Sequence, residues 1–127
     1  MRRTCTFLLI AIGLLNLFPV VGVFSADQIT GLYGIRVDSA DLETLMRHRA
    51  IMLGLIGGFL LFAAFRPQLQ LIAASMGLVS MSSFVVLACL SGEVGAQMGR
   101  VVAADIAGSI AAVLVLVIIV RERRSAA

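Results

Sequence analysis

Charged residues are scarce in this chain of 127 residues, where they make up 13% of the sequence. Soluble domains carry roughly 25% charged residues. Hydrophobic residues reach 61%, and they form long blocks instead of alternating with polar residues. The scarcity of charge excludes an ordinary soluble fold, and the blocks indicate an integral membrane protein.

Lysine is absent, so the net charge of +3 comes entirely from arginine. In a chain this apolar, a basic balance indicates cytoplasmic anchoring and not nucleic-acid binding. No basic patch is interleaved with aromatic residues, and no nucleic-acid partner is predicted. The absence of lysine itself carries no functional prediction.

Cysteine and histidine are also rare, with two cysteines and one histidine. Cys5 and Cys89 belong to opposite membrane faces in the topology predicted below, whereas a disulfide requires Cα atoms within about 7 Å. They are therefore predicted not to pair. No CxxC or Cys/His spacing suggests redox or metal chemistry, and His48 lacks partner ligands. No metal, cofactor or catalytic residue is predicted.

Four apolar blocks are long enough to cross a hydrocarbon core of about 30 Å as helices at about 1.5 Å per residue. They lack the dyad alternation of membrane β-barrel strands. The sequence therefore predicts an all-α, polytopic, four-transmembrane-helix bundle that forms one domain over residues 1–127. The predicted helices cover about 4–24, 43–65, 69–90 and 98–120.

The arginines predict the orientation of the bundle. They precede the first helix, occupy the tight "RPQ" turn between the second and third, and follow the fourth. If four helices cross, these places share one side, and the positive-inside rule makes that side cytoplasmic. Both termini are therefore predicted to be cytoplasmic, in a multi-pass inner-membrane protein. The arginines concerned are Arg2, Arg3, Arg66, Arg121, Arg123 and Arg124.

The first block has an alternative interpretation as a cleaved signal peptide. Arg2 and Arg3 precede an apolar run, and the small residues of "VFSAD" offer a cleavage point near Ser25 or Ala26. The run is long for a signal, and Asn16 within it is unusual. Retention of the block is the prediction. In the outer loop that follows, Asp38 and Asp41 are predicted to cap the second helix.

The cluster Arg47-His48-Arg49 precedes sixteen uncharged residues, on the predicted outer side. Arginines are expected to be few on that side, which disfavours an ordinary membrane flank. Helical geometry places residues of the first and fourth helices at a similar depth, with Asp105 roughly 7 to 8 Å below Arg100. The predicted outer-leaflet site therefore consists of Asn16, Arg47, His48, Arg100 and Asp105.

Charged groups at such depth usually face the bundle interior in pairs. Arg100 is turned about 140° from Asp105 on the same helix, so Asp105 is predicted to take an arginine from the second helix. Arg47 is the predicted partner because it continues a stripe of small residues that favours close helix contact. Arg49 is predicted to snorkel outward or to meet Glu93. The stripe consists of Ala50, Gly54, Gly57 and Gly58.

Three short motifs, "LNLFP", "GLYGI" and "LMRHRA", resemble those of a bacterial family of small four-helix membrane proteins of unknown function, broadly similar to the DoxX-like superfamily. The resemblance covers nearly the whole chain and implies a fold and a compartment, not a reaction. Similar proteins are sometimes labelled phosphopantetheine adenylyltransferase. That activity needs a doubly wound α/β domain and an HxGH-type motif, whereas His48 is followed by Arg-Ala.

The predicted function is noncatalytic: binding of a small anionic amphiphile, a lipid or a quinone, or of a membrane-protein partner. Arg47, Arg49 and Arg100 outnumber Asp105 and Glu93, and arginine suits a carboxylate or phosphate head. A small proton-coupled multidrug-type exporter, acting as a homodimer with Asp105 as the proton-coupled group, is the alternative. A purely structural ion-pair network also stays open.

Overall fold

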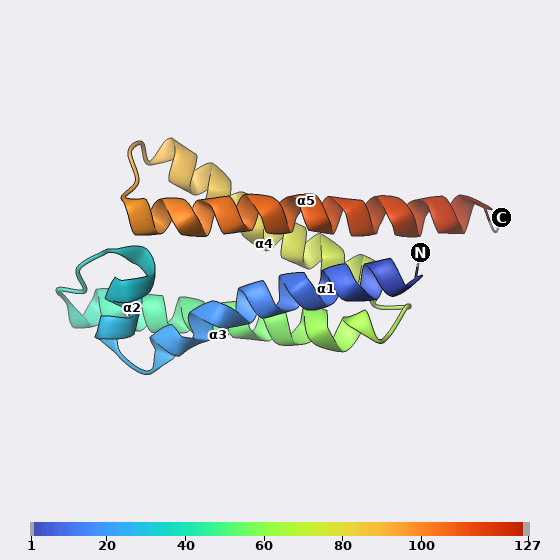
Figure 1. Ribbon diagram of the computed structural model, residues 1–127. Helices are drawn as coiled ribbons and strands as arrows, with labels where there is room; N and C mark the ends of the chain where they lie inside the picture. The colour runs from blue at the N-terminus through green and yellow to red at the C-terminus, as the bar shows by residue number, and fades with distance from the viewer. Residues whose placement is uncertain (1, 126–127) are drawn as a thin grey trace.

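A computed structural model describes residues 2–125 of the chain. Within this range all regular secondary structure is helical, and four long helices form a bundle (Figure 1). All four are long and apolar enough to cross a membrane. The predicted all-α, four-helix membrane fold is thus confirmed. The elements are α1 (Arg2–Leu17), the 3-10 helix η1 (Phe18–Val23), α2 (Ala26–Tyr33), α3 (Ala40–Ala64), α4 (Gln70–Leu90) and α5 (Ala96–Ser125).

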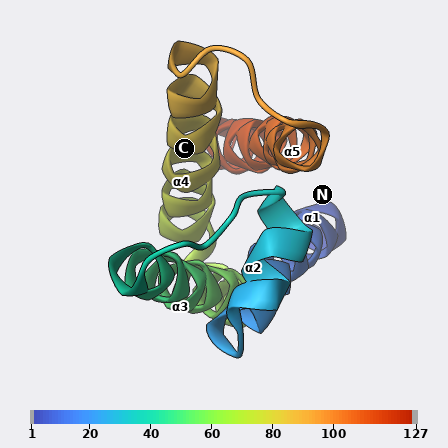
Figure 2. The ribbon, with the colours of Figure 1, turned by 90° about the vertical axis from the view of Figure 1, so that its left-hand side faces the viewer.

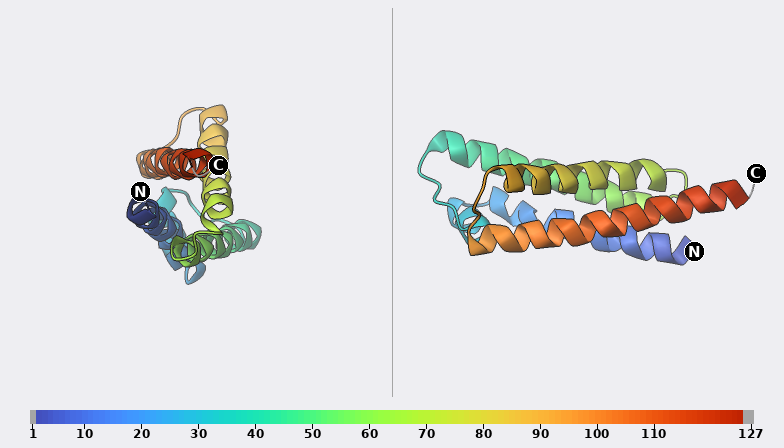
Figure 3. Two further views of the ribbon diagram at one scale, coloured as in Figure 1. Left: turned by 90° about the vertical axis from the view of Figure 1, so that its right-hand side faces the viewer. Right: turned by 90° about the horizontal axis from the view of Figure 1, so that it is seen from above.

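The bundle has two chemically different ends. Both termini and the α3–α4 turn lie at one end, which we call the basic end, and α2 and the α4–α5 loop lie at the other, the pocket end (Figures 1 and 3). The chain places six arginines and one glutamate at the basic end, against four arginines and six carboxylates towards the pocket end. The predicted grouping of the arginines at one end is therefore present.

The first membrane span is not one continuous α-helix, which corrects the predicted helix over 4–24. Regular α-helix ends at Leu17, and the chain continues as the 3-10 helix η1. Pro19 lies in the first turn of η1. Proline has no N–H to donate, and its ring conflicts with the carbonyl four residues earlier. The span nevertheless extends to Val23.

The segment between the first two spans contains a helix, α2, that was predicted as loop. The Ser25 side chain accepts a hydrogen bond from the Gln28 backbone N–H at 3.3 Å, which caps the first turn. Gly34 ends the helix in the left-handed conformation, with φ of 67°, and its N–H donates to the Thr30 carbonyl at 2.8 Å. α2 and the loop after it cross the pocket end (Figure 2).

Ser39, not Asp38, caps the following helix. The Ser39 side chain accepts from the Leu42 N–H at 3.1 Å, so α3 begins at Ala40, three residues before the predicted start. Asp41 lies in the first turn, where the helix dipole favours a negative charge. The predicted role of Asp38 as the cap is therefore wrong.

α1 and α3 pack closely because both carry glycine at their contact. A Cβ atom placed on Gly57 would lie 2.7 Å from the Gly13 carbonyl oxygen, and one placed on Gly54 would lie 2.7 Å from a Val20 methyl carbon. Ala50 is buried on the same stripe. Small residues let helices approach in this way in lipid. Ala50, Gly54 and Gly57 thus form a packing face, as predicted, that faces α1 and η1. Gly58, the fourth residue of the predicted stripe, is exposed, and nothing lies within 4 Å of a Cβ atom placed on it.

The main core lies between the middle of the bundle and the basic end. Its larger members, such as Leu9 and Leu60, are fully buried, and alanines fill most of the remaining contacts. Cys5 belongs to this core, while Cys89 is exposed at the pocket end, and both thiols are free, as predicted. The buried cluster comprises Cys5, Leu9, Ile12, Leu60, Ala63, Ala64, Ala73, Ala74, Met81, Ala112, Val115 and Ile119.

Candidate functional site

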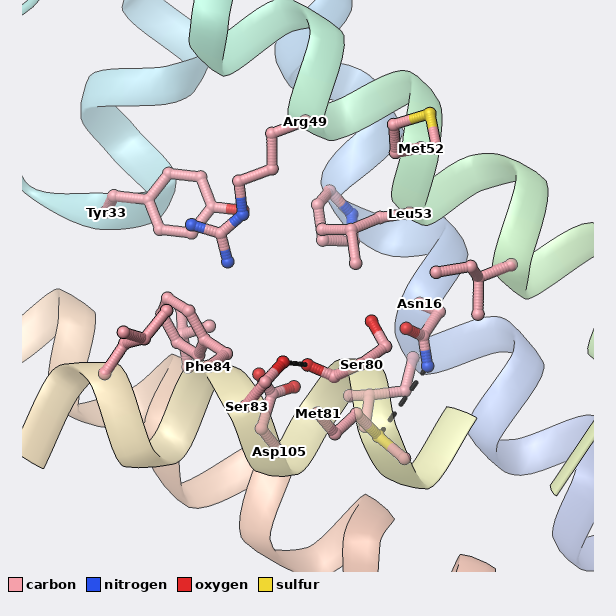
Figure 4. A pocket seen from close by; sticks show the side chains of 15 residues that line it. Asn16, Tyr33, Arg49, Met52, Leu53, Ser80, Met81, Ser83, Phe84 and Asp105 are labelled. Atoms are coloured by element: carbon pink, nitrogen blue, oxygen red, sulfur yellow. Dashed lines mark hydrogen bonds between the residues drawn. The ribbon is translucent and has the colours of Figure 1, made fainter. Parts of the chain in front are cut away.

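A pocket of about 370 Å³ opens between the helices at the pocket end (Figure 4). Ligand pockets commonly measure about 300 to 1,000 Å³ and are mostly apolar with a few polar groups. This pocket has that character. Its lining residues are Leu15, Asn16, Pro19, Tyr33, Arg49, Met52, Leu53, Ile56, Ser80, Met81, Ser83, Phe84, Leu87, Val101 and Asp105.

Arg49 reaches into this pocket from α3 between two aromatic rings. Its guanidinium carbon lies 4.9 Å from the centroid of the Tyr33 ring and 4.3 Å from that of Phe84. Cation–π contacts of this kind hold the guanidinium in place but leave its N–H groups available. Within residues 2–125, Arg49 forms no ion pair and no side-chain hydrogen bond. Its donors are therefore free to bind a ligand.

Asp105 lies on α5, on the opposite side of the pocket from Arg49 (Figure 4). No ion pair joins Asp105 to any arginine in the described part of the chain. The pocket therefore presents one cation and one carboxylate that face the same space without neutralising each other directly. This arrangement differs from the closed ion-pair network that the sequence also allowed.

The predicted pair between Arg47 and Asp105 is wrong. Arg47 instead contacts Glu43, one turn earlier on α3, with 2.6 Å between its guanidinium nitrogen and the carboxylate oxygen. The stripe of small residues that Arg47 continues faces α1 and η1, not α5. Arg49 lies about 200° further round the helix, and it faces α4 and α5 instead of snorkelling outward or meeting Glu93.

The remaining predicted residues have different positions. Asn16 is only 4% exposed, and its amide donates to the Ile12 carbonyl at 2.9 Å and lies 3.7 Å from the Met81 sulfur. Arg100 is exposed and lines a neighbouring pocket. His48 is exposed and lines neither this pocket nor the neighbouring one.

The neighbouring pocket, of about 440 Å³, lies between α1, α2 and α5. Gln97 and Arg100 provide its polar groups together with Asp105. The two pockets adjoin, because five residues line both: Leu15, Pro19, Tyr33, Val101 and Asp105. The structure thus gathers Asn16, Arg100 and Asp105 around a site in two parts, and leaves Arg47 and His48 outside it.

Tyr33 is a member of the site that the sequence reasoning missed. Its side chain is 4% exposed and lines both pockets, and its hydroxyl has no hydrogen-bond partner within residues 2–125. Burial raises the pKa of Tyr33, and Asp105 adds to this effect while Arg49 opposes it. The hydroxyl therefore stays protonated at neutral pH. The sequence offered one signal for this residue: Tyr33 is the only tyrosine of the chain, and in "GLYGI" it directly precedes a glycine that can end a helix.

The charges that line the two pockets leave one positive charge in excess. Arg49 and Arg100 contribute two cations and Asp105 one carboxylate, while Arg47 is neutralised outside the site by Glu43. The predicted excess of one positive charge is therefore retained, although fewer charged residues contribute to it. A head group with one negative charge would balance it.

No protein-family model, curated protein or solved structure matches this chain. Membership of the DoxX-like superfamily therefore stays a prediction. Among the described residues, no three histidine, cysteine or acidic side chains gather as metal ligands. The polar groups of the site are the arginines, the carboxylate and the phenol named above, the amides of Asn16 and Gln97, and the hydroxyls of Ser80 and Ser83.

Proposed function

We propose that the protein is a noncatalytic membrane protein that binds a small amphiphile, a lipid or a quinone-like molecule, with an acidic or otherwise oxygen-rich head. The observation that carries the proposal is Arg49, which two aromatic rings hold in a pocket without a carboxylate partner. An unpaired cation at membrane depth is costly. A ligand oxygen that accepts from Arg49 would remove much of that cost.

The depth and lining of the site favour an amphiphile over a water-soluble anion. Arg49 lies nine residues after Ala40, which is about 14 Å along α3. Most of the wall around its guanidinium is apolar, with Leu53, Ile56 and Leu87 among the lining residues. A polar head can bind Arg49 while an alkyl or isoprenoid tail contacts these side chains.

We further propose that the protein lies in a bacterial inner membrane with its basic end in the cytoplasm. The concentration of arginines at that end supports this orientation through the positive-inside rule. The site then lies in the outer leaflet. The resemblance to DoxX-like proteins agrees with this compartment.

Arg49 and Arg47 provide a matched pair of variants on one helix. In native mass spectrometry of gently extracted protein, wild type is expected to carry an acidic or quinone-like amphiphile. Arg49→Gln should lose it, because the charge-assisted hydrogen bonds disappear. Arg47→Gln should retain it, because Arg47 pairs with Glu43 outside the pocket.

Equal retention by the two variants would refute the proposal, as would wild-type protein that carries no such molecule. The same spectra give the number of subunits. A stable homo-oligomer or a copurified membrane protein, with no amphiphile in any charge state, would favour the partner-binding alternative. Thermal unfolding of both variants controls for misfolding.

Proton-coupled export remains a second candidate because Asp105 has no arginine partner in the described structure. A membrane carboxylate that is free to exchange a proton is what such an exporter requires. Asp105 faces both pockets. The two candidates differ in the charge of their ligands, since a cation exporter needs the negative charge of Asp105 and an anion site does not.

A further inference from the structure

The Tyr33 hydroxyl is an unexplained polar group in this bundle. It is buried, and no acceptor or donor of the described chain lies within hydrogen-bond distance. Buried hydroxyl groups of native proteins nearly always have a partner. An unpaired one at the wall of a pocket is free to pair with a group that enters the pocket.

One side-chain contact and one backbone turn position Tyr33. The Tyr33 ring packs against the guanidinium of Arg49, with 4.9 Å from the guanidinium carbon to the ring centroid. The backbone turns immediately after Tyr33 at Gly34, whose positive φ of 67° suits glycine. Tyr33 is thus held where the two pockets meet, close to the cation of Arg49 (Figure 4).

We propose that Tyr33 is a specificity-determining residue whose hydroxyl donates a hydrogen bond to the head group of the amphiphile, alongside Arg49. This inference rests on the proposed function. It narrows the ligand to heads with an acceptor oxygen that can reach both donors, as a carboxylate does with its two oxygens. A primary ammonium head has no acceptor and would leave both donors unpaired.

Oleate and oleylamine are suitable probes because they have the same chain and differ in the head. Binding of each to the full-length protein in lipid nanodiscs can be titrated by native mass spectrometry. Wild type should bind oleate in preference to oleylamine. Tyr33→Phe should weaken oleate binding about 10- to 100-fold, because a hydrogen bond to a charged group is lost while the ring stays.

A structural role of the hydroxyl would have a different signature. Since it has no partner in the protein, Tyr33→Phe should leave the thermal unfolding of the ligand-free protein unchanged. A clear drop in the ligand-free unfolding temperature would show that the hydroxyl serves the fold, and would overturn the inference.

The two proposals can fail separately. If wild type and Tyr33→Phe bind oleate equally while Arg49→Gln does not, the role of Tyr33 is refuted and the proposed function stands. If wild type binds no oleate and retains no acidic or quinone-like amphiphile, both are refuted. Preference for oleylamine would overturn the inference and support cation export.

Discussion

The two halves of the bundle are built from the same four helices, but the helices pack together more tightly in one half than in the other. Towards the basic end, alanine and glycine at the contacts let the helices meet, and residues such as Ala63, Ala73 and Ala112 are completely buried. Towards the pocket end, the same helices carry Arg49 and Asp105, and two adjoining pockets remain. The size and polarity of a few side chains thus decide where the bundle closes.

Lipid explains why these side chains matter so much. Helices in a membrane gain no hydrophobic free energy by leaving lipid for each other, so close packing and polar contacts must hold them together. The basic half uses close packing. The pocket half has polar groups whose partners are missing from the described chain, among them Arg49 and the Tyr33 hydroxyl. The first arrangement suits stability and the second suits binding.

Adding one methyl group to the tight contact of α1 and α3 should have the largest effect. Gly57→Ala would place Cβ 2.7 Å from the Gly13 carbonyl oxygen and 2.9 Å from the Leu17 backbone nitrogen. Backbone atoms cannot move aside as a side chain would. We expect the free energy of unfolding to fall by about 3 kcal/mol, measured by denaturant titration in detergent.

The neighbouring Gly58 is the matched control, because nothing lies within 4 Å of a Cβ atom placed there. Gly58→Ala should leave stability unchanged or raise it by up to about 1 kcal/mol through helix propensity. Similar losses for the two variants would mean that the close contact of α1 and α3 does not stabilise the fold.

The second largest effect on stability is expected from shortening a leucine side chain, and it should differ between the two halves. Leu60 is fully buried in the core near the basic end, whereas Leu53 borders the pocket. Leu60→Ala should cost about 2 kcal/mol, the low end of the range for such cavities, because packing is lost but no surface is exposed to water. Leu53→Ala should cost less than about 1 kcal/mol, since that space is already partly open.

Comparable losses at Leu60 and Leu53, measured in the same titrations, would show that the pocket half packs as tightly as the basic half. The pockets would then be poor candidates for a ligand site. A smaller loss at Leu53 that becomes larger when oleate is added would instead indicate that the side chain supports a bound tail.

Much of this fold could be predicted from the sequence because long apolar blocks directly report membrane helices. The end of regular α-helix inside the first block and the short helix between the first two blocks were harder to predict. Pro19 indicated the end of regular α-helix, but the chain stays apolar to Val23 and the whole run was predicted as one helix. The helix α2 has only eight residues, so its apolar pattern is too short to indicate a helix. Its one sequence signal is the capping motif of Ser25 with glutamine three residues later.

The candidate site depended on the rotation of α3, which sequence alone did not determine. The stripe of Gly54 and Gly57 was correctly predicted to pack against another helix, but its partner is α1 and not α5. Choosing the wrong partner placed Arg47 in the site, and Arg49 outside it. The depths of Asn16 and Asp105 did not depend on that choice, and both residues line the same pocket.

The smallest effect on stability is expected at Asp105. A carboxylate buried in an ion pair would leave an uncompensated cation when neutralised, at a cost of about 3 to 5 kcal/mol. Asp105 has no such partner in the described chain. Asp105→Asn should therefore leave the free energy of unfolding unchanged or slightly raised, because the substitution removes the cost of holding a carboxylate at this depth and breaks no ion pair of the described chain.

The ligand response of Asp105→Asn distinguishes the two candidate functions. Oleate binding should strengthen, because the variant removes a negative charge that faces the head group beside Arg49, and added salt should have little influence in this partly buried site. Titration of oleate and oleylamine into both proteins measures the change. Loss of binding to a cationic amphiphile, together with loss of its proton-driven transport in vesicles, would favour the exporter. A stability loss of several kcal/mol would instead identify Asp105 as part of a structural ion pair.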